Sequence, residues 1–222
     1  MTLEAIRIER TDEITGATLL HPCDLVIANG DRLVITGPSG AGKSVLMRAL
    51  ALLDRPDGEL RWRGHRIGRL RVPAFRSEVA YVRQRPALFE GSVEDNLRRP
   101  YELRIYRHRR YDRAVVLDYL SHASRAEPFL SQRADDLSGG EQQLVALIRT
   151  LQLAPSVLLL DEPTASLDPQ TVLAVEAMID HWAARTPGAA FAWVTHDLAQ
   201  ARRVGGRFAT MRAGVLELSN AP

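Results

Sequence analysis

The sequence predicts an α/β fold in which a mainly parallel sheet is covered on both faces by helices. In the last third of the chain, strands and helices alternate: a strand over 157–160, a helix over 169–185, a strand over 190–195 and a helix over 197–204. Such alternation is typical of parallel sheets built from strand–helix–strand units. The chain has 222 residues and 45% hydrophobic content, enough to bury a sizeable core, and we expect one domain over residues 1–222.

The remaining elements follow from local patterns along the chain. Residues 1–36 contain short strands and a tight-turn signal at Asn29-Gly30, which favours an antiparallel β subdomain at the N-terminus. Apolar residues at helical spacing predict a helix after residue 44, and strands are expected over 58–63 and 79–83. Residues 88–153 are mostly helical by pattern and form a predicted helical subdomain. A hairpin of 207–211 and 215–218 turns at Ala213-Gly214.

Composition narrows the classes of function. A net charge of +2 gives no electrostatic argument for nucleic acid, and we expect no nucleic-acid partner. The longest apolar run, Ala189–Val194, is far too short to cross a membrane, and residues 1–10 lack the apolar core of a secretory signal. Cys23 is the single cysteine, which excludes an intrachain disulfide, and we expect it to serve as a small hydrophobic residue and not as a reactive thiol. A role at a membrane would therefore need a second, membrane-embedded chain.

One lysine stands among the 29 basic residues of the chain, and all the others are arginine. This residue, Lys43, lies in a glycine-rich segment that matches a phosphate-binding loop and runs from a predicted strand into a predicted helix. In such a loop, backbone N–H groups and the helix N-terminus point at an anion, the lysine reaches the phosphates and the hydroxyl ligates Mg²⁺. The segment consists of Gly37, Pro38, Ser39, Gly40, Ala41, Gly42, Lys43 and Ser44.

A second chemical element follows the apolar strand 157–160. Asp161 stands at the carboxyl end of this strand, where it can hold Mg²⁺ beside the phosphate loop, or where it can simply cap the following turn. The phosphate loop earlier in the chain favours the metal-binding interpretation. The next residue, Glu162, is then placed to accept a proton from an attacking water.

Further motifs lie between and after these two elements. Leu137-Ser-Gly-Gly-Glu-Gln-Gln leads into a helix, Gln84 follows the predicted strand 79–83, Ser166-Leu167-Asp168 follows Glu162, and His196 follows the predicted strand 190–195. In this order and spacing, the chain resembles the ATP-binding-cassette (ABC) ATPases over nearly its whole length. The resemblance implies a P-loop NTPase fold with a helical signature subdomain, ATP and Mg²⁺ as cofactors, and ATP hydrolysis coupled to transport.

The resemblance also implies roles for individual residues. Glu162 would be the general base, His196 would contact the γ-phosphate, and Gln84 would sense the metal held by Ser44 and Asp161. Two copies of the chain would enclose two ATP molecules. The phosphate loop of one copy would face the signature of the other, and Asp168 would couple the two sites. The nucleotide-binding signature residues are Ser138, Gly139 and Gly140.

With its short length and the segments VITGPSGAGKS, IRTLQLAPSVLLLDE and AWVTHD, the chain also resembles ATPase subunits of small bacterial two-component exporters assigned to iron. This resemblance implies a peripheral protein on the cytoplasmic face of the inner membrane, bound to a permease. A soluble, non-transport ABC regulator remains the alternative. Seven arginines between Arg98 and Arg113 form either a solvated charged face or a docking surface near lipid headgroups. The family usually stacks an early aromatic residue on adenine, but residues 1–20 contain none, and Glu13 or Ile14 stands at the equivalent place.

Overall fold

The computed structural model describes residues 2–165 and 167–219, and the chain divides into two compact units. The sheet unit comprises Met1–Tyr81, Ser156–Glu162 and Pro187–Pro222. The helical unit comprises Val82–Pro155 and Pro163–Thr186. Ser166 of the predicted Ser166-Leu167-Asp168 motif lies outside the described residues.

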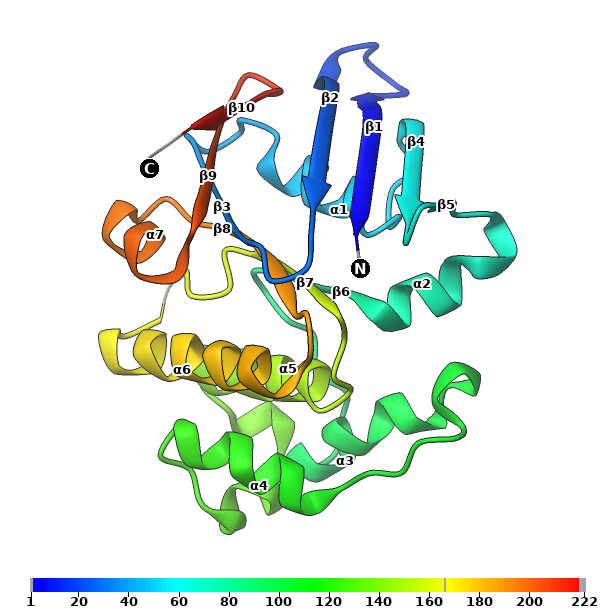
Figure 1. Cartoon of the computed structure of the whole chain (residues 1–222). Helices are drawn as coiled ribbons and strands as arrows, with labels where there is room; N and C mark the ends of the chain where they lie inside the picture. The colour runs from blue at the N-terminus through cyan, green and yellow to red at the C-terminus, as the bar shows by residue number, and fades with distance from the viewer. Residues whose placement is uncertain (1, 166, 220–222) are drawn as a thin grey trace. The chain divides into compact units, whose positions relative to one another are not determined.

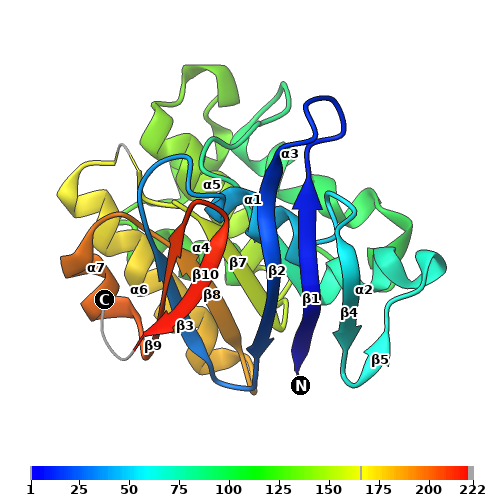
Figure 2. The same ribbon diagram turned by 90° about the horizontal axis from the view of Figure 1, so that it is seen from above.

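The sheet unit holds an antiparallel sheet at the N-terminal end of the chain. Its strand order is β2-β1-β4-β5, with β1 (Leu3–Thr11), β2 (Thr18–Ile27), β4 (Asp57–Trp62) and β5 (His65–Arg66). Figure 2 shows these strands side by side. The predicted antiparallel subdomain is therefore confirmed, but its hairpin turn lies between β1 and β2, around residues 12–17. Asn29-Gly30 does form a turn, yet it joins β2 to a strand of the other sheet.

The second sheet is the parallel core that the alternation predicts. Its order is β10-β9-β3-β8-β7-β6, and β3 pairs in parallel with both β8 and β9, as β7 does with β8 (Figure 1). Every residue of β7 and β8 is buried, as expected for strands covered on both faces. The strands are β3 (Arg32–Thr36), β6 (Val79–Val82), β7 (Val157–Asp161), β8 (Ala190–Val194), β9 (Arg207–Arg212) and β10 (Val215–Ser219).

One apolar cluster joins the two sheets within the sheet unit. Helix α1 (Lys43–Leu50) contacts β1 and β2 of one sheet and β7 of the other. Its residues Leu46, Met47 and Leu50 are buried in the cluster together with Ile8 of β1 and Leu159 of β7. The unit also contains α7 (Leu198–Val204), which contacts β3, and α2 (Val72–Glu78), which was not predicted from the sequence. This core fixes α1 against the parallel sheet.

The helical unit is built around α5 (Gly139–Leu151), which contacts α3 (Val93–Arg98), α4 (Arg113–His122) and α6 (Pro169–Arg185). Short 3₁₀ turns connect these helices at Arg99–Glu102, Arg104–Tyr106, Glu127–Ser131 and Ala134–Asp136. Trp182 of α6 is fully buried, and its indole N–H donates to the Pro155 carbonyl at 3.2 Å. No helix among the described residues has the length and apolarity needed to cross a membrane.

Candidate functional site

The parallel sheet brings three predicted site segments to one edge. Strands β3, β8 and β7 are neighbours and run in the same direction, so their carboxyl ends lie together. The glycine-rich loop follows β3, His196 follows β8, and Asp161 ends β7. Ligands of open α/β sheets bind at this carboxyl edge. The sheet topology therefore explains why residues more than a hundred positions apart share one site.

The loop before α1 takes a course that requires glycine at two positions. Gly37 has φ 144°, and a Cβ there would lie 2.1 Å from the Met211 carbonyl oxygen. Gly42 has φ 99° at the N-cap of α1, and its Cβ would lie 2.8 Å from the Leu19 carbonyl oxygen. Side chains at these positions would displace the backbone of β9 or β2. The loop is thus held tightly between two strands and leads directly into a helix N-terminus, which favours anion binding.

Lys43 is the first residue of α1, and its side chain is only 6% exposed. Its ammonium donates to the carbonyl oxygens of Gly37 and Pro38, both at 2.8 Å. The Glu162 carboxylate lies 4.0 Å from the same nitrogen. These contacts hold a buried positive charge inside the loop, where a phosphate group would be attracted to it.

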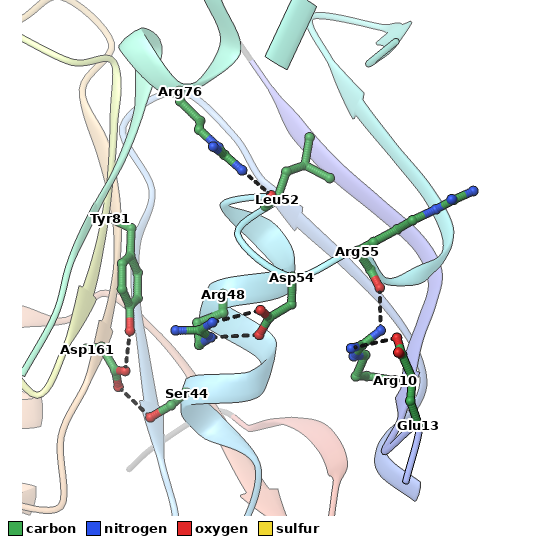
Figure 3. Close-up of polar contacts among 10 residues, drawn as sticks. All are labelled: Arg10, Glu13, Ser44, Arg48, Leu52, Asp54, Arg55, Arg76, Tyr81 and Asp161. Carbon is green, nitrogen blue, oxygen red and sulfur yellow. Dashed lines mark hydrogen bonds and ion pairs between the residues drawn. The ribbon is translucent and has the colours of Figure 1, made fainter. Parts of the chain in front are cut away.

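Asp161 is buried, and hydroxyl groups hold both of its carboxylate oxygens. Ser44 donates to Oδ1 at 3.0 Å, and Tyr81 donates to Oδ2 at 2.8 Å (Figure 3). Ser44 and Asp161 thus bring a hydroxyl and a carboxylate together, which is a suitable pair of oxygen ligands for Mg²⁺. No sequence pattern indicates a role for Tyr81, because a tyrosine in a strand carries no motif and its partner lies 80 residues further along the chain.

Glu162 has a strained backbone beside this carboxylate. Its φ is 46°, in the left-handed region that non-glycine residues rarely adopt, and its N–H donates to the Val194 carbonyl at 3.2 Å. The side chain is 21% exposed, so it remains accessible to solvent. Strain of this kind gathers at functional sites, because the surrounding structure must hold the residue in place.

His196 lies in the turn between β8 and α7 and is exposed. The next residue, Asp197, caps α7 by accepting from the N–H groups of Ala199 at 2.8 Å and Gln200 at 3.1 Å. This cap fixes the turn that carries His196. The structure places His196 at the predicted edge of the sheet, and its role in contacting phosphate stays a prediction.

The signature residues begin α5 in the helical unit. Ser138 caps this helix: its hydroxyl accepts from the Glu141 N–H at 3.3 Å, and Glu141 in turn accepts from the Ser138 N–H at 3.0 Å. The Ser138 hydroxyl also donates to the Glu141 carboxylate at 2.7 Å, and this bond, followed by the one from the Ser138 N–H, lowers the pKa of Glu141. Gly139 and Gly140 are the first two residues of the helix, so the signature presents a rigid helix N-terminus.

Asp168 caps α6 in the same unit. It accepts from the N–H groups of Gln170 and Thr171 at 3.0 Å, and from the Thr171 hydroxyl at 2.5 Å. The Thr171 hydroxyl is the largest cause of the lowered pKa of Asp168. A Cβ on Gly140 would lie 3.5 Å from the Leu167 side chain, so the signature and the Asp168 loop are neighbours within this unit. Gln84 is exposed and also belongs to the helical unit.

Comparison with known proteins gives the family. The family model described as "ABC transporter" matches residues 20–165 of this chain. The chain belongs to the ABC transporter family. As a member of this family it is a P-loop ATPase that binds ATP, as its resemblance to the ABC ATPases predicts.

Individual relatives agree with the family. The chain is 40% identical to "Probable iron export ATP-binding protein FetA" of Escherichia coli K12 over 86% of this chain and 84% of that protein. It is 37% identical to "Phosphate import ATP-binding protein PstB 2" of Natronomonas pharaonis, over 90% and 73% respectively. A solved dimer of an ATP-binding cassette with ADP and Pi matches with a TM-score of 0.84 and 26% identity, over 97% of this chain and 98% of that one.

Proposed function

We propose that this ABC ATPase powers transport through a separate membrane subunit and that its cargo is a metal ion, with iron export as the specific activity. The geometry that carries the ATPase part is the cluster of Lys43, Ser44, Asp161 and Glu162 at the carboxyl edge of the parallel sheet. The iron assignment rests on the similarity to the FetA protein. The two units would act together as one ATPase domain over residues 1–222, with the helical signature subdomain at about 88–153.

In this proposal, each residue of the cluster has one task. Lys43 neutralises phosphate charge from inside the loop, and the backbone N–H groups of the loop bind phosphate oxygens. Ser44 and Asp161 would hold Mg²⁺, with Gln84 as a further contact, and a bound ion would supply positive charge beside the phosphates. Glu162 accepts the proton of the attacking water, and His196 orients the γ-phosphate.

A second copy of the chain would complete each ATP site. The N–H groups at the start of α5, around Ser138 and Gly140, carry the positive end of the helix dipole, which suits the γ-phosphate of an ATP bound to the partner copy. The neighbouring Asp168 would connect this signature to the other ATP site. The solved cassette with ADP and Pi is itself dimeric, which supports this arrangement.

The arginine-rich segment 98–113 is better explained as a surface that binds a protein partner than as a freely solvated face. Several of its arginines are engaged within the helical unit: Arg98 pairs with Glu94 at 2.9 Å and lies over the Tyr111 ring, and Arg99 pairs with Glu102 at 3.3 Å. Around them, three apolar side chains are exposed: Phe89 by 53%, Leu103 by 56% and Ile105 by 40%. Exposed apolar groups beside arginines are typical of interfaces, and a membrane permease would cover them.

The substitution Glu162→Gln tests the catalytic part. The variant is expected to bind ATP but to hydrolyse it at least about 100-fold more slowly, because the general base is lost. It is also expected to accumulate an ATP-dependent dimer, measured by light scattering. Glu217→Gln, an exposed carboxylate of β10, is the matched control and retains activity. Wild-type turnover in Glu162→Gln would contradict the role of Glu162, and a monomer at saturating ATP would contradict the paired arrangement.

Transport is tested in the native cell. If the chain is a transporter subunit, it co-purifies from membranes with a permease, and its deletion raises cellular iron. A chain that remains entirely soluble and leaves cellular metal unchanged would instead favour the soluble ABC regulator.

A further inference from the structure

A cluster of metal-ligating side chains lies in the helical unit, apart from the residues assigned to ATP. Asp118 and His122 stand one turn apart on α4, and His181 stands on α6, which packs against α4 (Figure 1). One ligand atom from each of the three residues lies within 4.8 Å of the other two. Neither His122 nor His181 lies in a sequence motif, and nothing along the chain connects the two.

The contacts among these residues already aim their donor atoms at one another. His181 Nε2 lies 2.8 Å from Asp118 Oδ2, and the Arg185 guanidinium donates to the same oxygen at 2.8 Å. The His122 and His181 rings lie with their centroids 4.5 Å apart and their planes inclined by 45°. The buried ring of Tyr119 meets the His181 ring edge-on at 5.5 Å. Packing against Tyr119 therefore restricts the orientation of His181, as ordered metal ligands require.

The donor set selects a class of ion. Residues at i and i+4 share one face of a helix, so the Asp118 carboxylate and the His122 imidazole point to the same side of α4. Two imidazoles with one carboxylate bind Zn²⁺, Fe²⁺ and related divalent transition metals, whereas Mg²⁺ and Ca²⁺ prefer sites made of oxygen ligands. The chemistry of this cluster thus differs from that of Ser44 and Asp161.

An ion can reach the cluster from solvent. The His181 side chain is 22% exposed and the Asp118 side chain 38% exposed. His122 also lines a hollow of about 480 Å³ within the helical unit, to which Asp168 and Thr171 contribute as well, so solvent reaches its side of the cluster. Residues of both α4 and α6 thus border solvent at the place where the ligand atoms meet.

We propose that Asp118, His122 and His181 form a binding site for a divalent transition-metal ion and that the bound ion links α4 to α6. Arg185 competes with the ion for Asp118, because a guanidinium and a metal ion are both cations seeking the same carboxylate. Without the ion, the same groups form a His–Asp–Arg network that holds the two helices together. The proposal is independent of the cargo assigned to the transporter.

Zinc titration of the full-length, nucleotide-free protein tests the site. Calorimetry with Zn²⁺ is expected to show one strong site in the wild type, and His122→Ala and His181→Ala are each expected to weaken it at least about 10-fold, the scale on which site residues contribute to metal affinity. The matched control is His108→Ala, because His108 is an exposed histidine of the same unit outside the cluster. Any binding of Zn²⁺ at Ser44 and Asp161 would be the same in the wild type and in all variants, so the difference between their titrations reports the cluster alone.

Two further measurements keep the test decisive. Cobalt(II) in place of zinc is expected to give visible ligand-field bands in the wild type and in His108→Ala, but not in the two cluster variants. Saturating Zn²⁺ should raise the melting temperature of the wild type and of His108→Ala but not of the two cluster variants, because binding to the native state stabilises it. If an alanine variant fails to fold, His122→Gln and Asp118→Asn replace it. Equal zinc affinity in the wild type and the cluster variants would overturn the proposal and leave a purely structural His–Asp–Arg network.

Discussion

Tyr81 offers the sharpest test of how the sheet unit holds Asp161. Its hydroxyl donates to Oδ2 of a carboxylate that is only 4% exposed, at 2.8 Å (Figure 3). Tyr81→Phe removes this donor and keeps the ring, so the packing of β6 is preserved. A hydrogen bond to a charged group contributes about 1.5–3 kcal/mol to stability. Since 1 kcal/mol shifts the melting temperature of a chain of this size by about 2–4 °C, the expected loss is about 3–12 °C.

The assay is thermal unfolding in EDTA without nucleotide, followed by circular dichroism. The matched control is Tyr101→Phe, because the Tyr101 hydroxyl lies 3.5 Å from the neutral amide oxygen of Gln152. A bond of that length to an uncharged group contributes about 1 kcal/mol or less. The two tyrosines therefore separate the effect of a charged acceptor from the effect of losing a hydroxyl.

A double-mutant cycle with Asp161→Asn isolates the pair. Residues in direct contact show coupling energies of about 0.5–3 kcal/mol, and the geometry of Tyr81 and Asp161 predicts a value in the upper half of this range. A coupling below about 0.5 kcal/mol, or equal melting losses in Tyr81→Phe and Tyr101→Phe, would refute the reasoning that Tyr81 stabilises the Asp161 carboxylate.

Three other predictions concern single side chains. Ile14 is 95% exposed at the tip of the β1–β2 hairpin, so Ile14→Tyr should add a ring that can stack on adenine. The variant is expected to bind ATP about tenfold more tightly in calorimetry, and unchanged affinity would mean that this hairpin does not reach the base. Burial, assisted by the Asp24 charge, raises the pKa of the Cys23 thiol to about 11, so little of it is the reactive thiolate at pH 8. Iodoacetamide should therefore label Cys23 far more slowly in the native chain than in the urea-unfolded chain. Lys43→Arg should reduce ATP turnover at least tenfold although it keeps the charge, because the planar guanidinium is wider than the ammonium that it replaces. Normal turnover in this variant would contradict the requirement for a compact charge at position 43.

The sequence predicts the site best where chemistry and local pattern coincide. The loop at Gly37–Ser44 is predicted from residue types at fixed spacing. The structure explains two of its glycines, because a Cβ on Gly37 or Gly42 would clash with the backbone of Met211 or Leu19. The position of Asp161 is predictable because an unbroken apolar strand precedes it and all of β7 is buried. Strand periodicity and motif spacing are both local, and so both can be found in a single chain.

Features that depend on tertiary pairing escape such an analysis. Helix α2 was not predicted, because only Phe75 of its seven residues is buried and its apolar pattern is correspondingly weak. Asn29-Gly30 has the residues of a hairpin turn, yet β2 and β3 pair with strands of different sheets. The contact between Tyr81 and Asp161 spans 80 residues, and that between Asp118 and His181 spans 63. Which strands and helices become neighbours decides these contacts, and no local spacing encodes it.

The geometry around Lys43 gives a physical reason for the single lysine of this chain. Its ammonium lies 2.8 Å from two successive carbonyl oxygens, so the loop curls around a compact charge with three donors. A guanidinium is a wide planar fork, and seating it in the same buried place would push the Gly37 backbone against the Met211 carbonyl, where even a Cβ finds no room. Other positive charges pair with carboxylates and stack on rings, as Arg98 does, or donate to backbone carbonyls, as Arg149 does, and there the arginine fork is suitable. The single lysine of the chain thus agrees with the geometry: the arginine fork serves at the other positive charges, and lysine remains where the phosphate loop closes around a compact ammonium.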